Sequence, residues 1–224
     1  MLELEQYSGT LGIMGMDCVR GRFAESLAQM VSYTQVELLR NGNLPMYIHK
    51  APCTYHSLAR NSLVEHMQGD WLFMTDTDHQ FAPDMLVRLL RLSIKYNSDV
   101  ISGMYCSKYP PHQIIAGIWT NDDKLAHPVV EWNKEKEILN LPGPVGGGCI
   151  LIKRGVFDRI KNELKELPFL EYNNYSEDYA FCHRCKRLGI PIHLAINVES
   201  HHLIDHAISL EDYIPPPKSE MVGI

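Results

Sequence analysis

Several features that mark whole classes of protein are missing from this sequence of 224 residues. No apolar run approaches the roughly 18 residues that a membrane-spanning helix needs, so we expect no transmembrane segment. The opening stretch carries two glutamates and no basic residue, and we therefore expect no secretory signal peptide. Internal repeats and low-complexity segments are also missing, which leaves an ordinary globular domain.

Cysteine is sparse and lacks the spacing of a disulfide framework. One pair, Cys182 and Cys185, has the Cys-x-x-Cys spacing of half a zinc site, and His201-His202 could supply the other half. Both cysteines fall in a strongly helical stretch, so zinc is the weaker interpretation. A reducing, cytoplasmic location suits this cysteine content. The six cysteines are Cys18, Cys53, Cys106, Cys149, Cys182 and Cys185.

An excess of basic residues is missing too. Lys and Arg number 21 against 27 Asp and Glu, which gives a net charge of −6. A protein that grips nucleic acid through its phosphates usually shows a basic face, so we do not expect a nucleic-acid partner. The acidic balance suits an enzyme whose carboxylates hold a divalent cation that bridges to an anionic substrate. Oligomeric state and peripheral membrane contact stay open.

Short apolar strands alternate with amphipathic helices over the first half of the chain. This βαβ order predicts a parallel sheet with right-handed crossovers. The wholly apolar run at 71–74 is typical of a strand covered by helices on both faces. The predicted strands are 10–16, 45–50, 71–74 and 99–103, and the predicted helices are 22–40, 55–66 and 83–96.

The pattern changes near residue 104, where Pro, Gly, Trp, Asn and Lys indicate hairpins and loops up to 148. We predict a single domain over 1–205, with a nucleotide-binding half at 10–103 and an acceptor and catalytic half at 104–205. Residues 206–224 are predicted to form a C-terminal tail. Further predicted elements are a strand at 149–152, helices at 156–164 and 177–188, and a last strand at 190–198 that leads to His201-His202.

The strongest chemical signal is Asp76-Thr77-Asp78, placed where the apolar strand leaves the sheet. Ligands bind beyond the carboxyl ends of strands in open α/β sheets. In extended backbone the side chains of Asp76 and Asp78 point the same way, so both could hold one Mn²⁺ or Mg²⁺ ion. The alternative is a helix cap followed by a solvated aspartate.

Four further features could complete such a site. Gly146-Gly147-Gly148 lets backbone approach a ligand closely, although a β-bulge would explain it equally well. In Ser176-Glu177-Asp178, either carboxylate could act as a general base, and both also suit a helix N-terminus. A late histidine, His201 or His202, could join a metal site, and Arg60 could reach a diphosphate or pair with the aspartates.

Taken together, these pieces resemble the GT-A glycosyltransferases, especially the inverting type that includes small bacterial and viral enzymes. The resemblance covers about residues 10–203 and rests on the order of the pieces. They are ARN at 59–61, DTDHQF at 76–81, PGPVGGGCILIKR at 142–154, SED at 176–178 and the late histidine.

The resemblance implies an α/β fold of the GT-A type, a Rossmann-like nucleotide-diphospho-sugar transferase with a mixed, mostly parallel sheet flanked by helices. It implies transfer of a sugar from a nucleoside-diphosphate sugar, such as a UDP-sugar, to an acceptor hydroxyl with inversion. Asp178 then matches the catalytic base, with Glu177 as its neighbour. The implied metal ligands are Asp76, Asp78 and His202, with His201 as the fallback. The implied donor contacts are Arg60, Thr77, Gly146, Gly147 and Gly148.

One departure from the family pattern lies at the end of the first strand, which lacks the usual Thr-Pro or Asn-x-x ending. Met16 and Asp17 stand near the expected nucleobase contact. Other functions stay open: a retaining glycosyltransferase, an Asp-x-Asp phosphatase or phosphotransferase, a nucleotidyltransferase, and a non-enzymatic sugar-nucleotide binder. The order of elements disfavours the phosphatase, whose Asp-x-Asp normally follows the first strand.

Overall fold

The computed structural model describes residues 8–15, 18–52, 55–120, 126–172, 175–204, 207–209, 211 and 222–223. Its strands are β1 (Gly9–Gly15), β2 (Tyr47–Pro52), β3 (Trp71–Asp76), β4 (His79–Phe81), β5 (Val100–Met104), β6 (Gly117–Trp119), β7 (Ala126–Glu131), β8 (Ile138–Leu141), β9 (Cys149–Lys153), β10 (Ile192–Leu203), β11 (Ala207–Ile208) and β12 (Val222–Gly223). Its helices are α1 (Gly21–Arg40), α2 (His56–His66), α3 (Met85–Lys95), α4 (Arg154–Arg159), the π-helical turn η1 (Ile160–Leu164) and α5 (Glu177–Arg187).

The main sheet is mixed, in the order β11-β10-β5-β9-β3-β1-β2. Strands β2, β1 and β3 are parallel, as are β5 and β10, and β9 runs antiparallel between β3 and β5. The predicted mixed, mostly parallel sheet is therefore confirmed. The insertion of β9 also means that the fourth strand of the first half does not lie beside the third.

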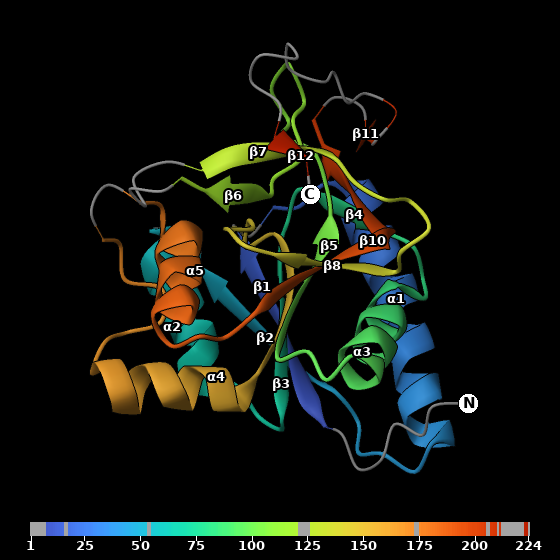
Figure 1. Cartoon of the computed structure of the whole chain (residues 1–224). Helices are drawn as coiled ribbons and strands as arrows, with labels where there is room; N and C mark the ends of the chain where they lie inside the picture. Colours follow the sequence, from blue (N-terminus) through green and yellow to red (C-terminus); the bar gives the residue numbers. More distant parts are fainter. Residues whose placement is uncertain are drawn as a thin grey trace.

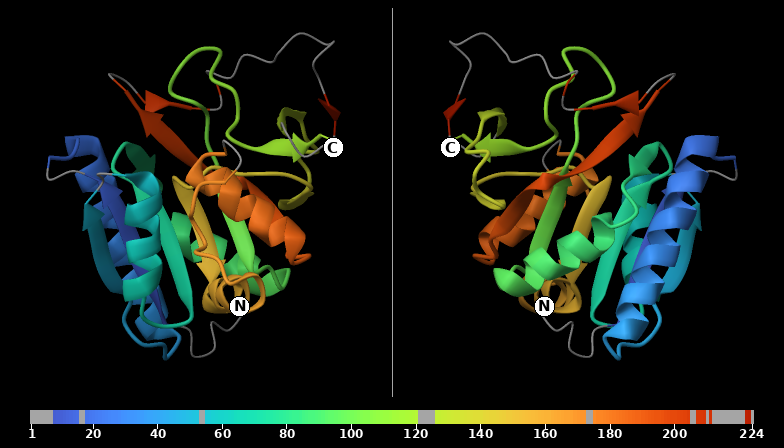
Figure 2. Two further views of the ribbon diagram at one scale, coloured as in Figure 1. Left: turned by 90° about the vertical axis from the view of Figure 1, so that its left-hand side faces the viewer. Right: turned by 90° about the vertical axis from the view of Figure 1, so that its right-hand side faces the viewer.

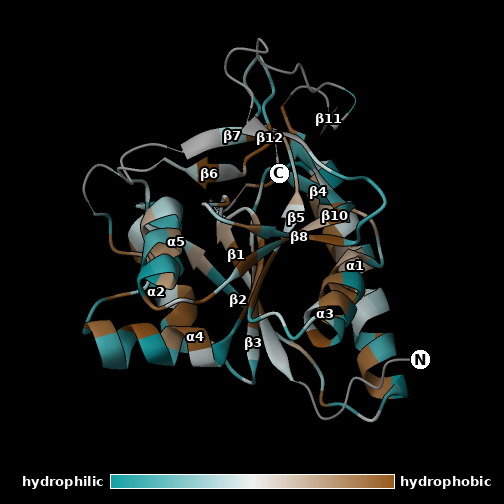
Figure 3. Ribbon diagram, viewed as in Figure 1, coloured by the Kyte–Doolittle hydropathy of each residue, from teal (hydrophilic) through white to brown (hydrophobic). Residues whose placement is uncertain are grey.

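Helices cover both faces of the sheet (Figure 1). Helices α1 and α3 lie on one face and α2, α4 and α5 on the other, and Figure 2 shows the same layers from the two sides. Each layer has its own apolar core, and the inner faces of the helices are the hydrophobic ones (Figure 3). In α1 the buried side chains of Phe23, Met30 and Leu38 recur at helical spacing, which explains why this segment folds onto the sheet.

Strand β10 pairs with different strands along its length. Its first part pairs with β5 and β8, and the register shifts between Ala195 and Glu199. Beyond this irregularity β10 pairs antiparallel with β4, so that His202 lies opposite His79. The backbone N–H of Leu203 also donates to the carbonyl of Asp78 at 2.6 Å. The end of β10 is thereby fixed against the chain that follows β3.

A second, small sheet of β6, β7 and β12 stands above this end of the main sheet (Figure 1). Residues 222–223 of the predicted tail pair with β7, and residues 207–208 pair with β10. The Pro215-Pro216-Pro217 run, expected to be extended, lies outside the described residues. Within the described part of the chain, no helix is long and apolar enough to cross a membrane.

Candidate functional site

Asp76 ends β3 and Asp78 follows in the tight turn that leads to β4. The two carboxylates do not have the same neighbours. Asp76 contacts Arg60, whereas Asp78 faces His202 and Lys108. The turn therefore directs Asp78 toward the end of β10 and leaves Asp76 beside α2.

Asp78, His79 and His202 form what we call the Asp-His-His group. One side-chain ligand atom from each lies within 4.8 Å of the others. The imidazoles of His79 and His202 stack with ring centroids 4.7 Å apart, and Tyr105 packs edge-on against both. Three side chains with metal-ligand chemistry are thus gathered by the β4–β10 pairing.

The hydrogen bonds of His202 indicate what can lie between its ring and Asp78. Its Nδ1 lies 2.9 Å from the carbonyl of Cys106, and a carbonyl only accepts, so Nδ1 carries a proton and donates. In a neutral ring Nε2 is then an acceptor, and it faces the acceptor Oδ2 of Asp78 at 3.2 Å. Two acceptors at this distance need a proton or a metal ion between them.

His79 adds a third acceptor. Its ring is fully buried, Nδ1 lies 2.7 Å from the hydroxyl of Ser200, and Nε2 has no hydrogen-bond partner. Burial and the nearby His202 lower the pKa of His79 to about 3, so the ring is neutral. When Nδ1 donates to Ser200, the lone pair of Nε2 is left bare, which is the form that binds a metal.

The aspartates differ electrostatically as well as in position. Burial raises the pKa of Asp76, and this effect exceeds the opposing attraction of Arg60. Burial acts in the same sense on Asp78, but the hydrogen bond and charge of His202 outweigh it, and the pKa of Asp78 is held well below its usual range. Asp78 is therefore the more strongly ionised carboxylate, as suits a ligand for a hard cation.

Lys108, in the loop after β5, also contacts Asp78. Its ammonium lies 3.0 Å from Oδ2 of Asp78, the same oxygen that faces His202. The hydrogen bond to Asp78 raises the pKa of Lys108. The side chain is 36% exposed, so it has room to move away. A protein cation thus contacts the oxygen best placed to bind a metal ion.

Arg60, on α2, is fully engaged within the protein. Its Nε donates to Glu177 at 3.0 Å, Nη1 to the carbonyl of Gly147 at 2.8 Å, and Nη2 to Asp76 at 3.1 Å. Burial opposes its charge, but Asp76 and Glu177 outweigh that effect and raise the pKa of Arg60. Arg60 therefore joins three segments of the site, and each of its nitrogen atoms donates to one of them.

Each of the three glycines before β9 packs against a different side chain. A Cβ on Gly146 would lie 2.0 Å from the hydroxyl of Tyr105, and one on Gly147 would lie 2.4 Å from the guanidinium carbon of Arg60. A Cβ on Gly148 would lie 2.4 Å from Nε2 of His79 and 3.2 Å from Oδ2 of Asp76. Because it lacks a Cβ, Gly148 can pack its backbone closely against the bare nitrogen of His79 and beside Asp76.

Glu177 and Asp178, at the start of α5, have different environments. Glu177 is buried and bound to Arg60. Asp178 is partly exposed, and its two oxygens accept the backbone N–H groups of Gly147 at 3.2 Å and Tyr179 at 2.8 Å. Ser176 stands at the N-cap position, but its hydroxyl bonds to Asp178 rather than to a backbone N–H.

The structure brings together only part of the predicted residue set. His202 reaches Asp78, whereas His201 lies 3.5 Å from Glu199, because successive side chains of a strand face opposite ways. Thr77 lies against β1, where a Cβ on Gly15 would touch it. Met16 and Asp17 lie outside the described residues.

Three residues of this region were not singled out from the sequence: His79, Tyr105 and Lys108. The sequence could have indicated His79, because it directly follows Asp78 in the motif DTDHQF. The zinc interpretation gains no support: Cys182 and Cys185 are packed in the apolar core, and of the residues that the structure describes, only the Asp-His-His group gathers potential metal ligands.

A mixed sheet between two helical layers, with an Asp-x-Asp at the end of a central strand, defines the class of GT-A glycosyltransferases. Sequence comparison agrees. The profile of "Glycosyl transferase family 2" matches residues 29–160, more than half of the chain, and the protein belongs to this family. It is a glycosyltransferase.

Solved structures share this fold. Protein A197 from STIV matches with a TM-score of 0.55 and 18% identity, over 96% of this chain and 97% of that one. GalNAc-T7, solved with UDP, GalNAc and Mn²⁺, matches with a TM-score of 0.60 and 14% identity, over 95% of this chain but only 45% of that one. Comparison with curated protein sequences gives no match.

Proposed function

We propose that this enzyme is a metal-dependent, inverting glycosyltransferase that uses a nucleoside-diphosphate sugar. The observation that carries the proposal is the Asp-His-His group, in which a carboxylate oxygen and two imidazole nitrogens lie within 4.8 Å of one another and Nε2 of His79 has no hydrogen-bond partner. Family membership sets aside the phosphatase, nucleotidyltransferase and non-enzymatic alternatives.

The residues present suit a divalent cation. Asp78, His79 and His202 would hold it. Mixed oxygen and imidazole ligands accept Mn²⁺, and the related GalNAc-T7 structure contains Mn²⁺ with UDP. When bound, such an ion would neutralise negative charge on the leaving nucleoside diphosphate.

Asp178 is the side chain we assign as general base. It is partly exposed, and hydrogen bonds from Gly147 and Tyr179 orient both of its oxygens. In a single displacement Asp178 takes the proton of the acceptor hydroxyl while the oxygen attacks the anomeric carbon from the face opposite the leaving group. Glu177 is excluded from that role by its burial and its ion pair with Arg60.

Arg60 and the glycines act by positioning. Every nitrogen of Arg60 donates within the protein, so we assign it to fixing Asp76 and the Gly147 carbonyl, not to direct contact with the donor. The buried Tyr105 hydroxyl accepts the N–H of Gly148 at 3.1 Å and holds the last glycine against the Asp-His-His group. Burial raises the pKa of Tyr105 well above its usual value, so this hydroxyl stays protonated.

The test is donor hydrolysis without acceptor. The purified protein is incubated with Mn²⁺ and a panel of sugar nucleotides that begins with UDP-sugars, and release of nucleoside diphosphate is measured. We expect release from one donor, abolished by EDTA and by Asp78→Ala and retained by Asp158→Ala, an exposed carboxylate change on α4. The anomeric configuration of the released sugar, followed by NMR, separates inversion from retention.

Two outcomes would contradict the proposal. Release that persists at full rate in Asp78→Ala would remove the metal assignment. Absence of release from every donor, together with absence of Mn²⁺-dependent thermal stabilisation by UDP or any other nucleoside diphosphate, would remove the donor assignment.

A further inference from the structure

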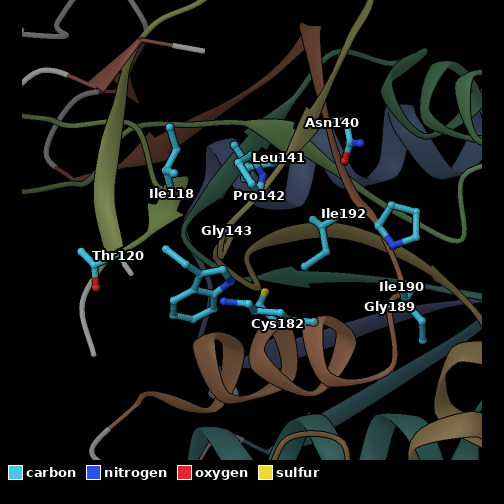
Figure 4. Close-up of a pocket in the computed structure, with 13 residues that line it drawn as sticks. Ile118, Thr120, Asn140, Leu141, Pro142, Gly143, Cys182, Gly189, Ile190 and Ile192 are labelled. Atoms are coloured by element: carbon cyan, nitrogen blue, oxygen red, sulfur yellow. The ribbon is translucent and has the colours of Figure 1, made fainter. Parts of the chain in front are cut away.

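A cavity of about 570 Å³ opens beside α5, and it shares no lining residue with the Asp-His-His group or with Asp178 (Figure 4). Its walls come from the end of β6, from β8 and the residues after it, from α5, and from the start of β10. A cavity of this size is in the range of small-ligand sites. Figure 4 shows Thr120, Asn140 and Cys182 around it.

The polar groups of the cavity match a sugar. Trp119 supplies an aromatic ring, on which the apolar face of a sugar ring can stack. Asn140 offers both an amide donor and an acceptor, so vicinal hydroxyl groups would find partners of both kinds. The ammonium of Lys186 lies over the ring of Trp119, 5.9 Å from the ring centre.

The charge of the cavity favours a neutral ligand. Lys186 is the one charged side chain among the lining residues that the structure describes, and no carboxylate is there to bind a cation. The ammonium stands at the C-terminal end of α5, where the helix dipole is negative and reduces its pull on an anion. Burial raises the pKa of the Cys182 thiol, so it stays protonated and is not a nucleophile or metal ligand.

Two continuous segments run from this cavity to the catalytic region. Helix α5 carries Asp178 in its first turn and Lys186 in its last, roughly 12 Å apart at 1.5 Å per residue. The chain from Leu141 to Gly143 lines the cavity and continues directly into the three glycines. Trp119 is tied to that segment, because its backbone N–H donates to the carbonyl of Pro142 at 3.1 Å.

We propose that this cavity is a binding subsite for a neutral sugar unit of an oligosaccharide acceptor, distant from the unit that reacts. The proposal rests on the proposed function, since it assigns the acceptor side of that reaction. An acceptor that spans α5 would place its reactive hydroxyl near Asp178 and a remote ring against Trp119. Acceptors of several sugar units would then be preferred over monosaccharides.

The test measures saccharide binding alone, without donor or metal. Saturation-transfer NMR is run on the full chain with maltotriose, cellotriose, chitotriose and mannotriose. We expect millimolar binding of at least one of them, weakened about five- to tenfold by Trp119→Ala. Asn140→Leu, at an exposed position, changes the hydrogen bonding without removing buried volume and is expected to weaken binding as well. Tyr33→Ala, an exposed aromatic change on α1, is the matched control.

The outcomes separate this proposal from the proposed function. Asp78→Ala is expected to bind the trisaccharide as the unaltered protein does, even though it loses donor hydrolysis. The subsite is wrong if no trisaccharide gives saturation transfer at about 10 mM trisaccharide. It is also wrong if Trp119→Ala and Asn140→Leu bind the trisaccharide as tightly as Tyr33→Ala does. Both conclusions hold whatever the donor assay shows.

Discussion

At the scale of single residues, Arg60 carries the largest concentration of contacts in the site. It is buried between Asp76 and Glu177, so its removal leaves two acidic groups facing each other without a cation. Breaking a buried ion pair by removing one partner costs about 3–5 kcal/mol. We expect Arg60→Met to lower the free energy of unfolding by this amount, measured by urea denaturation.

The paired change Arg60→Met with Glu177→Leu provides the check. Because it removes the stranded charge of Glu177 as well, we expect it to cost less than the sum of the two single changes. Additive costs would show that Arg60 and Glu177 do not interact energetically, in contrast to their 3.0 Å contact.

Lys108 allows a second prediction at this scale. Its ammonium contacts Oδ2 of Asp78, so a divalent ion that binds there must displace it. A partly exposed ion pair is worth about 0.2–1 kcal/mol, so Lys108→Met is expected to tighten Mn²⁺ binding about 1.4- to fivefold in the absence of nucleotide. Electron paramagnetic resonance of free Mn²⁺ measures this, with Lys161→Met on the exposed side of η1 as the control.

Weaker Mn²⁺ binding by Lys108→Met, or an equal change in Lys161→Met, would mean that Lys108 does not compete with the ion. An unchanged affinity would mean that its contact with Asp78 has no energetic weight.

The sequence located single residues unevenly. The end of the apolar strand located Asp76 and Asp78, but residue 78 lies in a turn, so the spacing of extended backbone did not predict where its side chain points. The sequence did not predict that the two carboxylates have different partners, because this depends on which helix and which strand end lie beside each of them. The choice of His202 over His201 likewise needs the register of β10 against β4. Lys108 lies in a loop, and no periodic pattern in the sequence predicts the path of a loop.

At the scale of elements, the glycine segment before β9 determines how closely the layers meet. A Cβ at Gly148 would lie 2.4 Å from Nε2 of His79 and 3.2 Å from Oδ2 of Asp76. We expect Gly148→Ala to destabilise the fold by about 1–3 kcal/mol through overpacking and to abolish Mn²⁺ binding. Urea denaturation and Mn²⁺ titration measure the two effects separately.

Gly155→Ala is the matched control, because a Cβ there would meet nothing within 4 Å and the residue lies in α4. It is expected to keep Mn²⁺ binding and to stabilise the protein by up to about 1 kcal/mol. If Gly148→Ala binds Mn²⁺ normally, the close packing of Gly148 against His79 does not matter for the metal site.

Most helices and long strands were predictable, and the short strands were not. The helix predicted over 22–40 is α1 almost residue for residue, because its apolar side chains recur on one face. Strands β4 and β8 span three and four residues, too short for an alternating pattern to stand out. The place of β9 between β3 and β5 could not be predicted from the sequence either, because strand order depends on packing between distant segments.

At the scale of the whole molecule, the predicted division into halves at 103/104 crosses one continuous sheet. Strand β9, from the second half, pairs with both β3 and β5 of the first. Neither half could fold alone without exposing the strand edges that β9 covers, so we expect the chain to unfold as one cooperative unit. The single-domain hypothesis over 1–205 therefore has a direct test.

Tryptophan reporters in each half make that test quantitative. Trp119→Phe with Trp132→Phe leaves Trp71, buried in β3, as the reporter of the first half. Trp71→Phe with Trp132→Phe leaves Trp119 in β6 as the reporter of the second. In each variant the fluorescence midpoint in urea is expected to coincide with the far-ultraviolet circular dichroism midpoint, since one sheet links both reporters. A fluorescence transition that precedes the dichroism transition for Trp119 but not for Trp71 would mean that the small sheet unfolds separately and that the chain holds two units.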